Sequence, residues 1–179
     1  MAFFDLPRDE ELTPEARQML EEYRRLAGTE TVSPGWRVYG RSPKIIEARF
    51  RAYQNLSQHC GFPWDARMVA VMLIAHAKRC QTCFAGSRVQ LDKLGFDEAT
   101  LDGFCANPGA LPLKERDRLF VHYAIKIATG SADLRPKDFR EMAEHGFSRD
   151  EIQEIIGFAA YWTMNIVFSQ SATAALAEE

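Results

Sequence analysis

The chain has 179 residues, of which 46% are apolar and 26% charged, with a formal net charge of −3. This composition is typical of a globular domain and excludes both a long disordered chain and a strongly basic nucleic-acid binder. No apolar run reaches the length of a membrane span, so we expect neither nucleic acid nor membrane among the partners. The N-terminal stretch Met1-Ala2-Phe3-Phe4-Asp5 lacks the pattern of a signal peptide, which predicts a cytoplasmic location.

The first helix is predicted to begin after Thr13, which has the side chain of a helix cap, with Pro14 at the first helical position. Apolar residues continue at helical spacing until Gly28. The following stretch, 29–42, contains Pro34-Gly35 and Gly40 and is predicted to be a loop.

Two further helices are expected over residues 43–58 and from about residue 64 to residue 77. The second of them carries eight consecutive apolar residues, Met68 to Ala75. Because this helix has no polar face, it is predicted to be central and buried.

The sequence Cys80-Gln81-Thr82-Cys83 follows this buried helix and comes directly after Lys78 and Arg79. Residues three apart on a helix or its first turn lie on one face, so the two sulfurs can approach disulfide distance. The neighbouring cations and the unpaired N–H groups of a helix start both favour a thiolate. The spacing therefore predicts a redox-active pair formed by Cys80 and Cys83.

Two other interpretations of the pair stay open, a metal half-site and an inert pair of small buried side chains. Zinc normally takes four ligands, and this chain offers Cys60, Cys105 and four histidines without a second ligand pair at the usual spacing. We therefore expect no metal and no bound cofactor. Cys60 and Cys105 are predicted to be small core residues.

The rest of the chain is predicted to be helical as well. Glycines and prolines divide it into helices over about 84–94, 97–104, 112–129, 136–145 and 148–176, the last of which begins with the capping box Ser148-Arg149-Asp150-Glu151. No segment alternates with period two over the length of a strand. The sequence thus predicts one all-α domain, 1–179, of seven or eight helices.

Within that domain we expect an N-terminal helix and loop over 1–42 and a helical core over 43–179. The buried helices near 68–77 and 155–168 each lead into a run of small residues. This likeness suggests an internal helical repeat.

The chain resembles the superfamily of carboxymuconolactone decarboxylases and alkylhydroperoxidase D. The resemblance lies in the buried helix, the stretch Cys80-Gln81-Thr82-Cys83 and the following Lys93-Leu94-Gly95-Phe96-Asp97-Glu98, and in the tail, where Gly146-Phe147-Ser148-Arg149-Asp150-Glu151-Ile152 precedes Gly157-Phe158-Ala159-Ala160-Tyr161-Trp162. It covers about 43–176 and implies an alkylhydroperoxidase D-like helical bundle that forms homo-oligomers, as dimers, trimers or hexamers.

For members with the CxxC pair, the resemblance implies a thiol peroxidase that needs neither metal nor haem. By this resemblance Cys83 attacks a hydroperoxide and Cys80 resolves the product as a disulfide, which an external dithiol then reduces. Such members usually carry a glutamate twelve residues before the first cysteine and a histidine four after the second, which relay the proton. Here these positions are Met68 and Ser87, and neither side chain acts as a base at neutral pH.

His76 is the replacement base that the sequence offers, because it lies four residues before Cys80. If the backbone stays helical through Cys80, then His76, Cys80, Cys83 and Ser87 share one face. The alternative is a histidine that bonds a backbone carbonyl at the end of the buried helix and takes no part in chemistry.

The leading functional prediction is a thiol-dependent peroxidase-like or disulfide oxidoreductase that uses Cys80 and Cys83 to reduce hydroperoxides. One alternative is a decarboxylase-like enzyme acting on a small lactone or carboxylate, against which the retained CxxC speaks. The other is a non-catalytic, redox-sensing helical oligomer, which the lost proton relay favours.

Overall fold

A computed structural model describes residues 2–177, so the first residue and the last two of the predicted domain lie outside the described residues. In this part of the chain the regular secondary structure is helical and there is no β-strand, which confirms the all-α prediction. The α-helices are α1 (Pro14–Ala27), α2 (Pro34–Arg37), α3 (Pro43–Ala52), α4 (Trp64–Ala77), α5 (Gln81–Lys93), α6 (Glu98–Ala106), α7 (Glu115–Gly130), α8 (Pro136–Glu144) and α9 (Arg149–Leu176).

The short helix α2 is the element that the sequence analysis missed, because its residues were predicted to be loop. Pro34 stands at its first helical position, as in α1, but the helix makes only one turn. The helix predicted over 43–58 is present as α3, continued by six residues of π-helix, Tyr53–Gln58.

The chain packs into two compact units, described here separately. One contains the described residues up to His59 and those from Val167 onward; the other is Cys60–Ile166. Helix α3, which the sequence analysis assigned to the core, thus belongs with the N-terminal helix. The single domain 1–179 stays a prediction.

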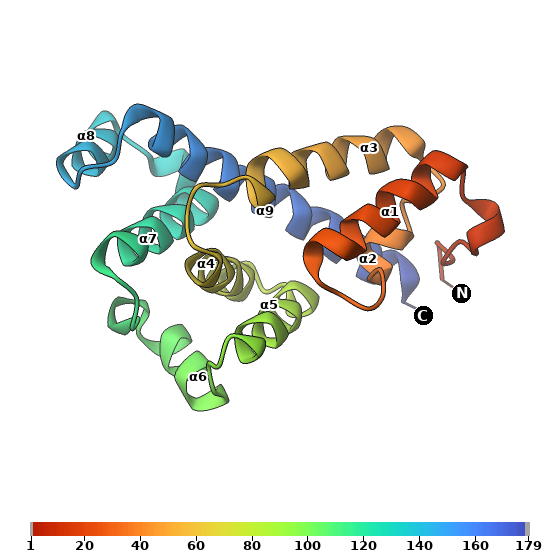
Figure 1. Cartoon of the computed structure of the whole chain (residues 1–179), viewed down its shortest axis with the longest axis horizontal. Helices are drawn as coiled ribbons and strands as arrows, with labels where there is room; N and C mark the ends of the chain where they lie inside the picture. The colour runs from red at the N-terminus through yellow and green to blue at the C-terminus, as the bar shows by residue number, and fades with distance from the viewer. Residues whose placement is uncertain (1, 178–179) are drawn as a thin grey trace. The chain divides into compact units, whose positions relative to one another are not determined.

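In the first unit α1 and α3 lie side by side (Figure 1). Trp36 of α2 stacks on Tyr23 of α1, with 4.0 Å between the ring centroids. The guanidinium of Arg49, on α3, is buried over the Trp36 ring at 4.1 Å and donates a hydrogen bond to the carbonyl of Gly35. These contacts hold α2 against the other two helices.

In the unit Cys60–Ile166, α4 is the central helix, and α5, α6 and α7 pack against it (Figure 1). Every residue from Met68 to Ala75 is buried, as the apolar sequence predicted. Phe120 of α7 stacks on Phe62 at 4.2 Å and meets Phe158 of α9 edge-on at 5.3 Å. Burial of each such ring contributes about 1.5–3 kcal/mol to the stability of this core.

The predicted helix ends are confirmed where a specific side chain or glycine sets them. The Thr13 side chain accepts the N–H of Ala16 at 3.2 Å, and Gly28 ends α1 in the left-handed conformation, with φ of 61°. At the start of α9, Glu151 and Ser148 form the expected reciprocal pair of hydrogen bonds, at 2.8 and 3.2 Å.

The two buried helices that suggested a repeat end differently. α4 stops at Ala77, before its small-residue run, whereas α9 continues unbroken through Ser169 and Ser171. The internal repeat stays a prediction. Among the described helices, none combines the length and apolarity that crossing a bilayer requires.

Candidate active site

The joint between α4 and α5 places the two cysteines. The N–H of Cys80 donates to the carbonyl of Ala75 at 2.9 Å, and the N–H of Arg79 donates to that of His76 at 3.0 Å. This pattern is a Schellman motif, and it holds Arg79 in the left-handed region, with φ of 56°. The carbonyl of Cys80 then accepts the N–H of Phe84 at 2.9 Å, which opens α5. Cys80 thus ends one helix and caps the next.

The two sulfurs differ in their access to solvent. Cys80 is only 2% exposed, whereas Cys83, on the first turn of α5, is half-buried. Both are free thiols in this structure. A reagent from solvent therefore meets Cys83 first.

The pKa of Cys80 is lowered from 9.0 to about 7. The main cause is the S–H of Cys83, which donates a hydrogen bond to the Cys80 sulfur. Burial acts in the opposite direction, and the backbone N–H groups of Cys83 and Thr82 lower the pKa further. The sulfur makes no capping bond of the kind that a serine or aspartate oxygen makes at this position, so its stabilisation depends mainly on its partner thiol.

The causes of this pKa shift differ in part from those expected from sequence. Lys78 and Arg79 were expected to favour a thiolate in the pair, and neither is among the groups that lower the pKa of Cys80, so their effect on Cys83 stays a prediction. The left-handed turn at Arg79 redirects the chain between these cations and the start of α5. The predicted contribution of the helix N–H groups is present.

Neither residue at the usual relay positions provides a base. Met68 is 4% exposed and belongs to the hydrophobic core. Ser87 is equally buried, and its hydroxyl donates a hydrogen bond to the carbonyl of Phe84 at 2.8 Å. The hydroxyl is thus engaged within its own helix turn.

His76 does not share a continuous helix with Cys80, because α4 ends at Ala77. The helical geometry on which its predicted role depended is therefore absent. The ring is exposed, and its centroid lies 5.5 Å from that of Phe84, next to Cys83 in sequence. Its role as a base stays a prediction.

The sequence analysis did not single out Arg88, which ties the cysteine-bearing helix to α6. Its guanidinium donates to Asp102 at 2.6 Å and lies 5.5 Å from the centre of the Phe84 ring. The spacing of four residues between Phe84 and Arg88 is the signal that would have found this pair. On α6, burial raises the pKa of the Cys105 thiol, and the charge of Arg88 partly offsets this rise.

The predicted site residues do not assemble a metal-binding group. Among residues 2–177 no three histidine, cysteine, aspartate or glutamate side chains come together in an arrangement that would hold an ion.

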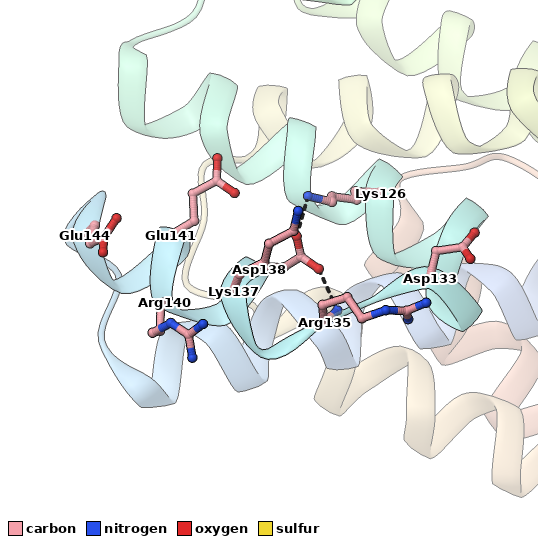
Figure 2. A pocket seen from close by; sticks show the side chains of 8 residues that line it. All are labelled: Lys126, Asp133, Arg135, Lys137, Asp138, Arg140, Glu141 and Glu144. Carbon is pink, nitrogen blue, oxygen red and sulfur yellow. Dashed lines mark hydrogen bonds and ion pairs between the residues drawn. The ribbon is translucent and has the colours of Figure 1, made fainter.

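A charged hollow of about 560 Å³ lies at α7 and α8, and none of the predicted site residues lines it. Figure 2 shows Lys126 and Asp138 facing each other there, with their side chains 2.8 Å apart. Asp138 also accepts the N–H of Arg135 at 2.6 Å, and these two contacts lower the pKa of its carboxyl. Its buried carboxylate is fully engaged in holding α8 to α7.

Comparisons with known proteins address the fold. No family model matches the chain, and no curated protein matches it. A crystal structure described as an alkylhydroperoxidase AhpD core, of an uncharacterised peroxidase-related protein from Ralstonia eutropha JMP134, is similar with a TM-score of 0.78 at 20% identity. An uncharacterised peroxidase-related protein from Silicibacter sp. TM1040 is similar with a TM-score of 0.76 at 18% identity. Each comparison covers 99% of this chain and 92% of the other. The chain therefore has the all-helical fold of the alkylhydroperoxidase AhpD core.

Proposed function

We propose that this protein is a thiol-dependent oxidoreductase in which Cys80 and Cys83 cycle between a dithiol and a disulfide to reduce hydroperoxides. The observation that carries the proposal is the hydrogen bond from the Cys83 thiol to Cys80. It stabilises the thiolate form of Cys80 near neutral pH at the start of α5. The fold shared with proteins described as peroxidase-related supports the same chemistry.

In the proposed reaction the half-buried sulfur of Cys83 attacks the terminal oxygen of a hydroperoxide, the O–O bond breaks and an alcohol leaves. Cys83 is then a sulfenic acid, which Cys80 attacks to form the disulfide and release water. An external dithiol exchanges with this disulfide and restores both thiols. Because Cys80 is buried, its disulfide-forming attack is protected from competing reactions with solvent.

The test is a titration of free thiols before and after one equivalent of an organic hydroperoxide. The wild type and the matched control Cys105→Ser are expected to lose two thiols each. Cys83→Ser is expected to lose none. If the wild type also loses none, the pair does not reduce hydroperoxides and the proposal is wrong.

The lost relay supports a second candidate, a redox sensor that is oxidised once and does not turn over. Met68 is buried in the core and the Ser87 hydroxyl is engaged, so the usual proton path is missing. Steady-state consumption of hydroperoxide with excess dithiothreitol separates the two candidates, because a sensor stops after one equivalent. Sedimentation velocity of the reduced and oxidised chain tests the homo-oligomer expected of either.

A further inference from the structure

A second hollow, of about 450 Å³, lies along one face of α7 within the unit Cys60–Ile166, and is called here the α7 hollow. None of the four cysteines, all of which lie in the described part of the chain, lines it. We propose that the α7 hollow binds a small aliphatic carboxylate, an acid with one charged head and an apolar chain. This inference goes beyond the proposed function and does not depend on it.

Aliphatic side chains form the floor of the α7 hollow. Val121 is 1% exposed, and Leu119 and Ile125 are half-buried and pack against the hydrophobic core. Pro108 and Gly109 complete the apolar part of the lining. A hollow lined in this way favours an apolar chain, because the chain leaves water without covering a buried polar group.

The polar side chains of the α7 hollow provide a place for an anionic head. Arg118, His122 and Lys126 follow one another at intervals of four residues, so they form a row along the helix. The Lys126 ammonium is engaged with Asp138, 2.8 Å away, as Figure 2 shows. The head group therefore meets Arg118 and His122.

Arg118 has donors to spare. Its Nη1 donates to the carbonyl of Leu113 at 3.2 Å, and within residues 2–177 its guanidinium forms no ion pair. A guanidinium presents five N–H donors in a planar fork, which matches the two oxygens of a carboxylate. An exposed arginine without an acidic partner, at the edge of an aliphatic floor, is thus complementary to an amphipathic acid.

Glu115 is the acidic side chain among the described residues that line the α7 hollow. It precedes Arg118 by one helical turn and opposes a bound anion by charge repulsion. His122 lies on the other side of Arg118 along the row, so a carboxylate held between Arg118 and His122 is one turn further from Glu115. The opposite charges of Arg118 and Glu115 provide a test in which two substitutions act in opposite directions.

The hollow between α7 and α8 offers no such combination. Its described lining consists of four cationic and four acidic side chains, so its charges balance and it has no aliphatic floor. It provides a matched control position, Arg140, which is exposed like Arg118.

The experiment is an amide NMR titration of the full chain with octanoate, and in parallel with octylammonium and acetate. Octanoate should move the amide signals of residues 108–109 and 115–126. Octylammonium has the same chain with the opposite charge, and acetate has the same head without the chain, so neither should move these signals at the same concentration. The signals of the rest of the chain report that each variant is folded.

Arg118→Gln should weaken octanoate binding about tenfold, the effect of losing one charge-assisted contact. Glu115→Gln should strengthen it, because the repulsion is removed. Arg140→Gln should bind octanoate like the wild type.

Four outcomes overturn the inference. They are α7 signals that octanoate does not move, equal shifts with octylammonium or acetate, an Arg118→Gln variant that binds octanoate as tightly as the wild type, and weaker binding in Glu115→Gln. Because the titration involves neither thiols nor peroxide, it is independent of the thiol titration that tests the proposed function.

Discussion

At the scale of single residues, the hydrogen bond between the two thiols determines which sulfur is charged. In Cys83→Ala the donor is lost, so the pKa of Cys80 should rise from about 7 towards 9.0. A smaller rise is expected in Cys83→Ser, whose hydroxyl still donates. The measurement is a pH titration of the thiolate absorbance in the ultraviolet, and equal midpoints in the wild type and Cys83→Ala would contradict the assignment.

The same shift makes stability depend on pH. Because the pKa of Cys80 is lower in the folded chain than in the unfolded one, its thiolate adds stability that is complete above about pH 9 and is lost as the pH falls towards 7. The wild type should therefore gain stability relative to Cys83→Ala between pH 7 and pH 9. Urea unfolding at both pH values measures the difference, and a gain of the same size in both chains would contradict it.

Arg79 is a second residue with a specific prediction, since a side chain in the left-handed region is strained. Arg79→Gly should raise the free energy of unfolding by about 0.5–1 kcal/mol. Lys78, which precedes it with φ of −89°, is the matched control, and Lys78→Gly should lower stability. Urea unfolding measures both. Because Arg79 is not among the groups that set the pKa of Cys80, that pKa should stay unchanged in Arg79→Gly.

At the scale of helices, the capping box of α9 is reinforced from α7. Arg116 donates to both Glu151 and the carbonyl of Gly146, and its guanidinium holds the pKa of Glu151 at about 2. A depressed carboxyl pKa adds stability that is complete above about pH 4.5 and is lost as the pH falls towards 2. Glu151→Gln should therefore lower the Tm at pH 7, and its difference from the wild type should shrink between pH 5 and pH 3. Asp150→Asn, which removes an exposed carboxylate from the same first turn of α9, is the control.

The positions of most helices could be predicted from the sequence, because nearby capping residues and glycines determine most helix ends. Thr13, Gly28 and the Ser148–Glu151 box each act within three or four residues, so their effect does not depend on the rest of the fold. The short helix α2 was not readable, because its one turn is held by Trp36 stacking on Tyr23 and by Arg49, contacts between residues distant in sequence.

Part of the candidate site could also be predicted from the sequence, because its cysteines lie close together in the chain. The CxxC spacing identified Cys80 and Cys83, and the substitutions at Met68 and Ser87 identified the missing relay. The pattern did not reveal the left-handed turn at Arg79, since arginine carries no preference for that conformation. As a result the sequence alone left open whether the helix continues through Cys80 and brings His76 to the same face as the cysteines. It also named the neighbouring cations and the helix N–H groups, but not the partner thiol, as causes of a lowered thiol pKa.

At the scale of the whole molecule, α9 contributes residues to both compact units without a break. Helix formation is cooperative, so a single domain predicts that both units unfold together. The double variant Trp64→Phe/Trp162→Phe retains Trp36 as its one tryptophan, which reports on the first unit. Its fluorescence melt should coincide with the melt followed by far-ultraviolet circular dichroism, and two separate transitions would show two domains.

The connection between α4 and α5 has a fixed length, because Cys80 takes part in the last hydrogen bond of the α4 C-terminal motif and is also the N-cap of α5. Inserting one residue after Arg79 would turn α5 by roughly 100° about its axis, given 3.6 residues per turn. Leu91, now fully buried, would swing away from the core, while a polar neighbour would swing towards it. An insertion or deletion at this point is therefore incompatible with the present packing. A chain with this architecture has to keep the same number of residues between the buried helix α4 and the two cysteines.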